Sequence, residues 1–362
     1  MRERVGAALA LAAVWVVATN VGPFSSTEVN DLFVYGTYAD LLRDGQIPYL
    51  EFGFEYPPLA LIPIGALGGN EAAFSIGMLA CAAVCQWCAF ELGGRWSGWA
   101  MVALPVLAGA MVRTHFDLFA TAIVMLGLVY AIASPWLLGA ATMAKLWPGT
   151  VALTWLHTRR DWMIYAAVCL AIAIPALALG AWDLVRFHWD RPIQIESTPA
   201  SVLFALGGSD VTGHPVRPDP YKSNGLDGGY AGVVGPLFTA IQLLAIAWFV
   251  THARNGRLHA SLGAATAFVA FGKVLSPQYM LWLFPLAVAV GGPPAWLIAG
   301  ATALTQVEFP TRYFDLVDRD GSTVAVVAAR NGLLIAAVLA TARALARSSP
   351  PAAAASSESR PR

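Results

Sequence analysis

The stretch "NDLFVYGTYADLLRDGQIPYLEFGFEYPPL", residues 30–59, holds the first side chains along this sequence that could do chemistry. It carries five carboxylates among tyrosines and phenylalanines. Apolar residues recur at helical spacing after Asp31, which predicts an amphipathic helix on a membrane surface that ends at Gly45. Asp31 is therefore either a capping carboxylate or a general base. Glu51 and Glu55 are either solvated loop acids before the Pro-Pro turn or part of a site.

Candidate cations follow in or beside apolar runs. The guanidinium fork of Arg113, in "RTHFD", suits a phosphate, and Asp117 could orient it or cap the next helix; the alternative is an ordinary interfacial arginine. Lys145, in "ATMAKLWPGT", interrupts an apolar run, where a cation is costly unless it pairs, reaches the interface or meets an anion. Lys273 ends another run and either snorkels or binds an anion. Hydrogen-bonding groups follow it at Gln278 and Tyr279.

The segment "RFHWDRPIQIES", residues 186–197, mixes cations with aromatic rings. His188 and Arg191 suit an anion, while Phe187 and Trp189 suit a sugar face or the membrane interface. Neither zinc spacing nor a nucleotide-binding glycine loop nor a Ser-His-Asp elbow is visible. The four cysteines lie in apolar runs without a nearby His or carboxylate, so we interpret them as buried thiols. We predict no cofactor and no metal.

The elements that position these groups are predicted to be membrane helices. The chain is 57% hydrophobic and 12% charged, against about 25% charged residues in soluble domains. Lys plus Arg equals Asp plus Glu at 22 each, which gives no indication of nucleic acid as a partner. The apolar runs are 5–21, 72–92, 99–112, 117–133, 136–155, 162–181, 231–251, 259–273, 279–292, 294–309 and 323–342. We expect an all-α bundle of about nine to eleven spans in one domain, residues 1–345, and a disordered cytoplasmic tail, residues 346–362. The N-terminal run is expected to be an uncleaved first helix, although it resembles a signal peptide.

Charge predicts the orientation of these helices. The short basic breaks are predicted to be cytoplasmic by the positive-inside rule: Arg2 and Arg4, 157–161, 252–257, and Arg343 and Arg347. The acidic breaks, 22–56, 182–230 and 310–321, should then face outward. An odd number of crossings must separate the external break 22–56 from the cytoplasmic break 157–161. This requirement is met if 57–69 is a shallow re-entrant segment and 136–155 is a helix pair that enters and returns on the cytoplasmic side. Residues 113–117 then also lie outside.

The order of the polar pieces resembles a known family. The pieces are Asp31 after the first span, "YLEFGFEYPPL", "RTHFD", the Lys and Pro of "KLWPG", "RPIQIES" and "KVLSPQYMLWLFP", over residues 28–290. Together they resemble the polytopic glycosyltransferases of the GT-C superfamily and, more narrowly, glycosyltransferase family 87, the polyprenyl-phosphate-mannose-dependent α-mannosyltransferases of actinobacteria.

The resemblance implies an inverting enzyme of the bacterial plasma membrane. It would move a sugar, mannose in that family, from a polyprenyl-phosphate donor to a glycolipid or glycan acceptor on the external face. Asp31 would be the catalytic base, and one carboxylate suffices because the departing phosphate needs charge stabilisation instead of an acid. The expected donor-phosphate ligands are Arg113, Lys273, His188, Arg191 and Lys145. The expected sugar or acceptor contacts are Tyr56, Glu55, Asp117, Gln278 and Tyr279.

The main alternative is a multi-pass transporter or flippase of an envelope lipid or glycan precursor. Such a protein usually shows ionisable groups near mid-membrane and broken helices in two repeated halves. The sequence shows one such lysine, Lys145, and no second copy of its surroundings, while the other polar groups gather in the predicted external breaks. This pattern favours an enzyme at the membrane surface.

Overall fold

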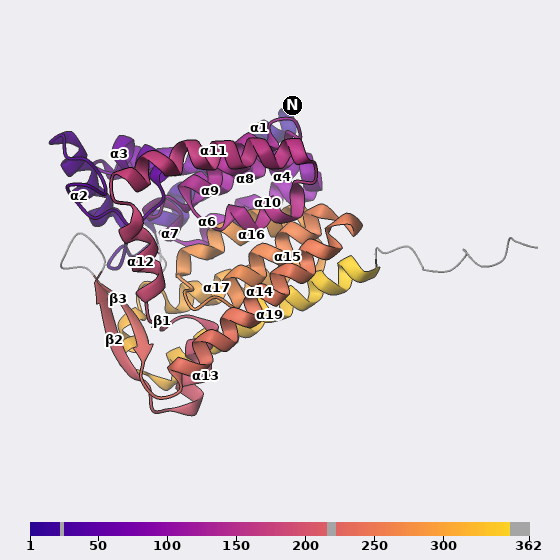
Figure 1. Ribbon diagram of the computed structural model, residues 1–362. Helices are drawn as coiled ribbons and strands as arrows, with labels where there is room; N and C mark the ends of the chain where they lie inside the picture. Colours follow the sequence, from indigo (N-terminus) through magenta and orange to yellow (C-terminus); the bar gives the residue numbers. More distant parts are fainter. Residues whose placement is uncertain (22–24, 216–221, 348–362) are drawn as a thin grey trace, which may run out of the picture.

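Helices form nearly all the regular structure in the computed structural model, which describes residues 1–21, 25–215 and 222–347 (Figure 1). The first half contains α1 (Arg2–Asn20), α2 (Leu32–Arg43), η1 (Pro58–Ala60), α3 (Leu61–Leu67), α4 (Glu71–Gly93), α5 (Arg95–Ala100), η2 (Met101–Ala103), α6 (Leu104–Ala108), α7 (Met111–Thr114), α8 (Asp117–Val129), α9 (Ser134–Ala144), α10 (Pro148–Trp155) and α11 (Arg159–Ala178). The second half contains α12 (Trp182–Asp190), β1 (Ile193–Gln194), α13 (Thr198–Leu206), β2 (Asp210–Pro215), β3 (Lys222–Asp227), α14 (Ala231–His252), η3 (Ala253–Asn255), α15 (Arg257–Ala270), η4 (Pro277–Tyr279), α16 (Met280–Val290), α17 (Gly292–Glu308), α18 (Tyr313–Val317) and α19 (Gly321–Arg347). Of the tail predicted to be disordered, residues 346–347 are instead the end of α19, and residues 348–362 lie outside the described residues.

Among the described residues, five helical segments are long and apolar enough to cross a bilayer: α1, α4, α11, α14 with η3, and α19. They hold 19 to 27 residues, and a rise of about 1.5 Å per residue makes them roughly 28–40 Å long, enough for a hydrocarbon core of about 30 Å. They indicate a multi-pass membrane protein. Shorter apolar helices lie at Pro58–Leu67, Asp117–Val129 and Pro277–Val290. Of the nine to eleven spans expected, five are therefore long enough to cross a bilayer as single helices.

Helix boundaries follow the hydropathy pattern closely, with two interruptions that position polar groups. The run 136–155 is broken as predicted, because α9 ends at Ala144 and α10 begins at Pro148, whose ring favours the first turn of a helix. The run 99–112 is also broken: α6 ends at Ala108, and Gly109 follows with a φ of 53° before the short helix α7. The segment predicted to be re-entrant forms η1 and α3, which together are too short to span.

A small sheet departs from the all-α expectation. In the segment 182–230, predicted to be a loop, three antiparallel strands pair in the order β1–β3–β2. Leu226 of β3 pairs with both Ile193 and Val211 and is buried over α13 in a hydrophobic cluster separate from the main core. The strands are short and rich in Gly, Pro and polar residues, so they lack the alternation by which a strand is predicted.

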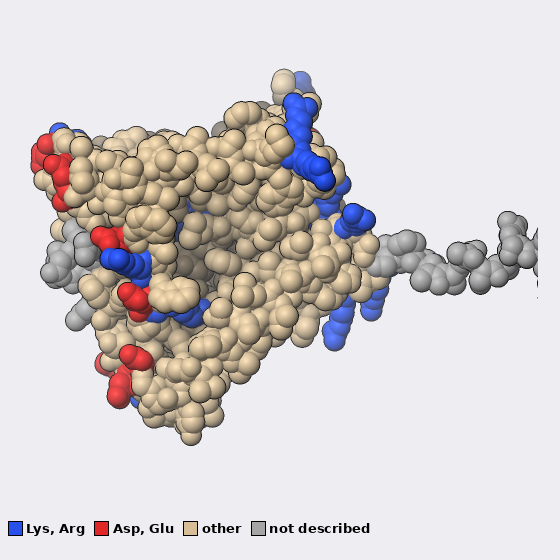
Figure 2. Space-filling view, viewed as in Figure 1, with Lys and Arg blue, Asp and Glu red and all other residues tan. Residues whose placement is uncertain are grey.

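The two ends of the bundle differ in charge. Figure 2 shows Lys and Arg gathered at the end that carries the N-terminus and the last turns of α19. Asp and Glu lie mainly at the opposite end, beside α2, α12 and the strands (Figures 1 and 2). The four basic breaks therefore lie at one end of the bundle. This agrees with the prediction that all four lie on the same side of the membrane.

Candidate functional site

Asp31 lies at the acidic end of the bundle, in the residue before α2. It occupies the N-cap position, yet its side chain makes no capping hydrogen bond, so the capping interpretation is wrong. Asp31 Oδ2 instead accepts a hydrogen bond of 3.0 Å from the hydroxyl of Tyr35, one turn further along, and lies 3.6 Å from Nε2 of His115. The carboxylate side chain is 30% exposed, which leaves room for a substrate to reach it. The helix ends as predicted, with Gly45 at a φ of 82°.

His115 is buried, and its hydrogen bonds assign the proton on Nδ1. The carbonyl of Met111, 3.3 Å away, can only accept. The hydroxyl of Thr114, 2.9 Å away, donates to the carbonyl of Ala110 and therefore accepts from the ring. Nε2, the other ring nitrogen, faces the Asp31 carboxylate at 3.6 Å.

Lys145 is buried at the break between α9 and α10, so it neither snorkels nor faces lipid. Its ammonium donates to Oδ1 of Asp117 at 2.9 Å, and the indole of Trp282 donates to the same oxygen at 2.5 Å. Asp117 Oδ2 has no hydrogen-bond partner in the described part of the chain. Asp117 thus orients Lys145, and not Arg113 as its spacing had indicated.

Aromatic rings enclose this ion pair and join it to the base candidate. The ammonium of Lys145 lies 4.5 Å from the ring centre of Phe116, 5.4 Å from that of Tyr56 and 5.5 Å from that of Trp282. The Phe116 ring also packs edge-on, at 5.6 Å, against Tyr35, whose hydroxyl donates a hydrogen bond to Asp31. Rings attract cations through their quadrupole, so they stabilise the Lys145 ammonium in addition to Asp117.

Two aromatic rings stack on Trp282. Tyr279 of η4 stacks on it at 3.8 Å and Trp147 at 5.4 Å. Gln278, beside Tyr279, is partly buried. Of the predicted contacts in "SPQY", Tyr279 therefore lies next to the Lys145–Asp117 pair through Trp282, although more than a third of the chain separates them.

The other predicted cations divide into two kinds. Lys273 donates to the carbonyls of Trp189 and Arg191 at 2.7 and 2.9 Å, so it holds the end of α12 in place. Arg113 and Arg191 are partly buried, and each has a buried Nε without a hydrogen-bond partner among the described residues. These two guanidinium groups have donors to spare for an anion.

The positive charge of Arg191 affects the pKa values of two neighbouring groups, Glu55 and His188. Burial raises the pKa of Glu55 from 4.5 to about 8, and Arg191 offsets part of this rise. Burial and Arg191 lower the pKa of His188 from 6.5 to about 4, so its imidazole is neutral near pH 7. A neutral imidazole is a hydrogen-bonding group and not the cation that the sequence suggested.

A buried network ties the loop after α12 to the bundle. The Gln194 backbone N–H donates to the Lys273 carbonyl at 2.9 Å, and its side-chain amide donates to Glu196 at 2.7 Å and Ser276 at 3.1 Å. Arg330 of α19 donates to the Glu196 carbonyl at 2.5 Å. Burial, with a smaller contribution from a nearby acid, raises the pKa of Glu196, and Arg330 offsets part of the rise. This network fixes the backbone that carries Arg191.

Three site residues were not assigned by sequence reasoning: Tyr35, His115 and Trp282. Tyr35 could have been found from its i+4 spacing to Asp31 on a predicted helix. Trp282 had no signal, because its partner in the site lies 165 positions away.

Comparison with protein-family models, curated proteins and solved structures finds no match to this chain. The site is therefore interpreted from its own geometry.

Proposed function

We propose that this protein is an integral membrane glycosyltransferase of the GT-C type, similar to glycosyltransferase family 87. It would transfer a sugar, with mannose expected, from a polyprenyl-phosphate donor to a hydroxyl of a lipid or glycan acceptor, with inversion. The remaining crossings of the expected nine to eleven would come from the shorter helices, chiefly α8, α15, α16 and α17.

One arrangement carries the proposal: a partly exposed carboxylate beside a buried, neutralised lysine at the end of an apolar bundle. Asp31 is held by Tyr35 and His115, and the Phe116 ring joins it to Lys145. A hydroxyl needs a base within hydrogen-bond reach, and a departing phosphate needs positive charge. Asp31 would supply the base, and the spare donors of Arg113 and Arg191 would supply the positive charge.

The proposed step uses Asp31 as the base. The acceptor hydroxyl gives its proton to the carboxylate while its oxygen bonds to the anomeric carbon of the donor. The bond from that carbon to the phosphate oxygen breaks, and the electron pair leaves with the polyprenyl phosphate. Arg113 and Arg191 are the best-placed ligands for the developing charge, because Lys273 is committed to two carbonyls and Lys145 to Asp117.

The acidic end would face the outside of the cell. The basic breaks at the opposite end favour the cytoplasm, and the end that carries α2 and α12 then meets lipid-linked sugars at the external leaflet.

Asp31→Asn tests the assignment. The asparagine keeps the shape and an acceptor for Tyr35 but cannot take a proton, so transfer from polyprenyl-phosphate sugars should fall at least about 100-fold. Asp40→Asn is the matched control, because Asp40 lies exposed on the same helix and pairs with Arg43. Transfer by purified Asp31→Asn at the rate of the control would rule out Asp31 as the base.

The Lys145–Asp117 pair favours a second candidate, a transporter or flippase of an envelope precursor. Buried ionisable groups at a broken helix also mark transport pathways. Proteoliposomes separate the two functions: a transporter moves the polyprenyl-phosphate sugar across the bilayer unchanged, whereas the proposed enzyme releases polyprenyl phosphate and a new glycoside.

A further inference from the structure

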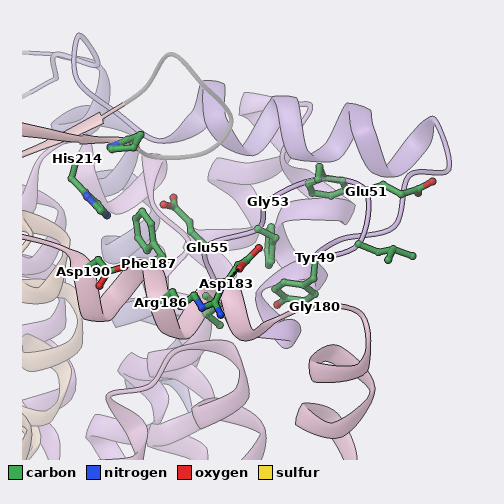
Figure 3. Close-up of a pocket in the computed structure, with 15 residues that line it drawn as sticks. Tyr49, Glu51, Gly53, Glu55, Gly180, Asp183, Arg186, Phe187, Asp190 and His214 are labelled. Atoms are coloured by element: carbon green, nitrogen blue, oxygen red, sulfur yellow. Dashed lines mark ion pairs between the residues drawn. The ribbon is translucent and has the colours of Figure 1, made fainter.

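A cavity of about 410 Å³ lies between the first polar loop and α12. Residues 49–55 form one wall, and the turn at Gly180 with one face of α12 forms the other (Figure 3). His214, from β2, closes a third side. A volume of this size accommodates one or two sugar rings and is typical of small-molecule sites.

The side chains around the cavity suit a neutral, hydroxyl-rich ligand. Asp183 and Asp190 supply carboxylate oxygens and Glu55 a carboxyl group, all of which accept hydrogen bonds from hydroxyl groups. The Phe187 ring lies beside Glu55 (Figure 3) and offers an apolar face. Arg186, the cation of this lining, is 3.8 Å from Asp183 and so is partly neutralised. This balance disfavours an anion such as the donor phosphate.

The cavity adjoins the base through two consecutive residues. Glu55 lines the cavity, whereas the ring of the next residue, Tyr56, lies 5.4 Å from the Lys145 ammonium. The Tyr56 ring also packs edge-on against Tyr35 at 6.2 Å, and Tyr35 donates to Asp31. These packed rings therefore connect the cavity to the proposed site of sugar transfer.

The outer face of α12 indicates that the cavity lies at the membrane surface. Trp182, Val185 and Trp189 are all more than half exposed and share one side of the helix at i, i+3 and i+7. The opposite side carries the cavity residues Asp183, Phe187 and Asp190. Tryptophans with one exposed apolar face are typical of the lipid interface. Thus α12 separates the cavity from lipid headgroups.

We infer that this cavity binds the carbohydrate part of the acceptor. The inference rests on the proposed function and adds the location and chemical class of the second substrate. The carbohydrate comes either from a glycolipid headgroup or from a free glycan, which present the same hydroxyls to the cavity.

Kinetics of two variants test the inference, Phe187→Ala and the double variant Asp183→Asn/Asp190→Asn. Both aspartates are exposed, so their replacement should leave folding intact. The KM for the acceptor should rise about tenfold or more in each variant, because a hydroxyl bond or a sugar-ring contact is lost, while the KM for the donor stays within about twofold. Asp40→Asn again serves as the control. Unchanged acceptor KM in both variants, in an enzyme that transfers sugar, would overturn the inference and leave the proposed function standing.

A binding measurement keeps the inference testable even if transfer fails. Saturation-transfer NMR with purified Asp31→Asn protein in nanodiscs would use methyl and octyl glycosides of mannose, glucose and galactose as probes. Saturation of the sugar protons that disappears in Phe187→Ala supports the site. Tighter binding of the octyl glycosides assigns it to a lipid headgroup, and equal binding to a free glycan. Saturation that is absent, or that persists unchanged in both cavity variants, overturns it. If glycosides bind but wild-type protein converts none of the polyprenyl-phosphate sugars, the proposed function is wrong, whereas the assignment of the cavity as a carbohydrate site is supported.

Discussion

Replacing Asp117 by asparagine should destabilise the protein strongly, because it removes the counter-charge of a buried lysine. Asp117 is fully buried and Lys145 is 8% exposed. Asparagine keeps an oxygen for Trp282 and Lys145, so the change removes charge and little shape. Breaking a buried ion pair in this way costs about 3–5 kcal/mol. At about 2 °C per kcal/mol for a large domain, the melting temperature should fall by roughly 6–10 °C.

The assay is thermal unfolding of the purified protein in detergent, with a double-mutant cycle. Lys145→Met keeps an unbranched chain among the rings of Phe116, Tyr56 and Trp282 but removes the charge. The double variant Asp117→Asn/Lys145→Met should therefore recover much of the stability lost in Asp117→Asn, with a coupling energy of about 2 kcal/mol.

Asp40→Asn is the control for this cycle, since the exposed Arg43–Asp40 pair is worth at most about 1 kcal/mol. The reasoning is refuted if Asp117→Asn melts within about 2 °C of the wild type, or if the two single changes simply add.

Two further predictions concern the surroundings of Asp31. Tyr35→Phe keeps a fully buried ring but removes its hydrogen bond to the carboxylate, so transfer should fall about tenfold, with a loss of only a few degrees in melting temperature; an unchanged rate would mean that Tyr35 does not orient the base. The raised pKa of Glu55, about 8 in the folded chain against 4.5, means that the folded protein holds this proton more tightly and loses stability as pH rises from about 5 to 8. Melting curves across this range should show the wild type losing stability relative to Glu55→Gln, and a constant difference would contradict the assigned burial.

Much of the fold follows from the sequence because hydropathy acts locally. The long apolar runs became α1, α4, α11, α14 and α19 with boundaries within a few residues of those expected. Local residue types and their spacing also predicted the helix after Asp31, its end near Gly45 and the break at Lys145–Trp147. Lys145 could be singled out because a cation in an apolar run must be compensated wherever the chain folds.

The partners of these groups were decided only by tertiary packing. Asp117 pairs with a lysine 28 positions away and an indole 165 positions away, and helix packing alone brings those three groups together. Lys273 had the charge of a phosphate ligand, but its neighbours in space made it an anchor for two carbonyls. The cavity beneath α12 has no sequence signature either, since its walls come from segments more than a hundred residues apart. Residue type and local spacing determine which groups must be compensated or exposed, and the packing of distant helices determines what compensates them.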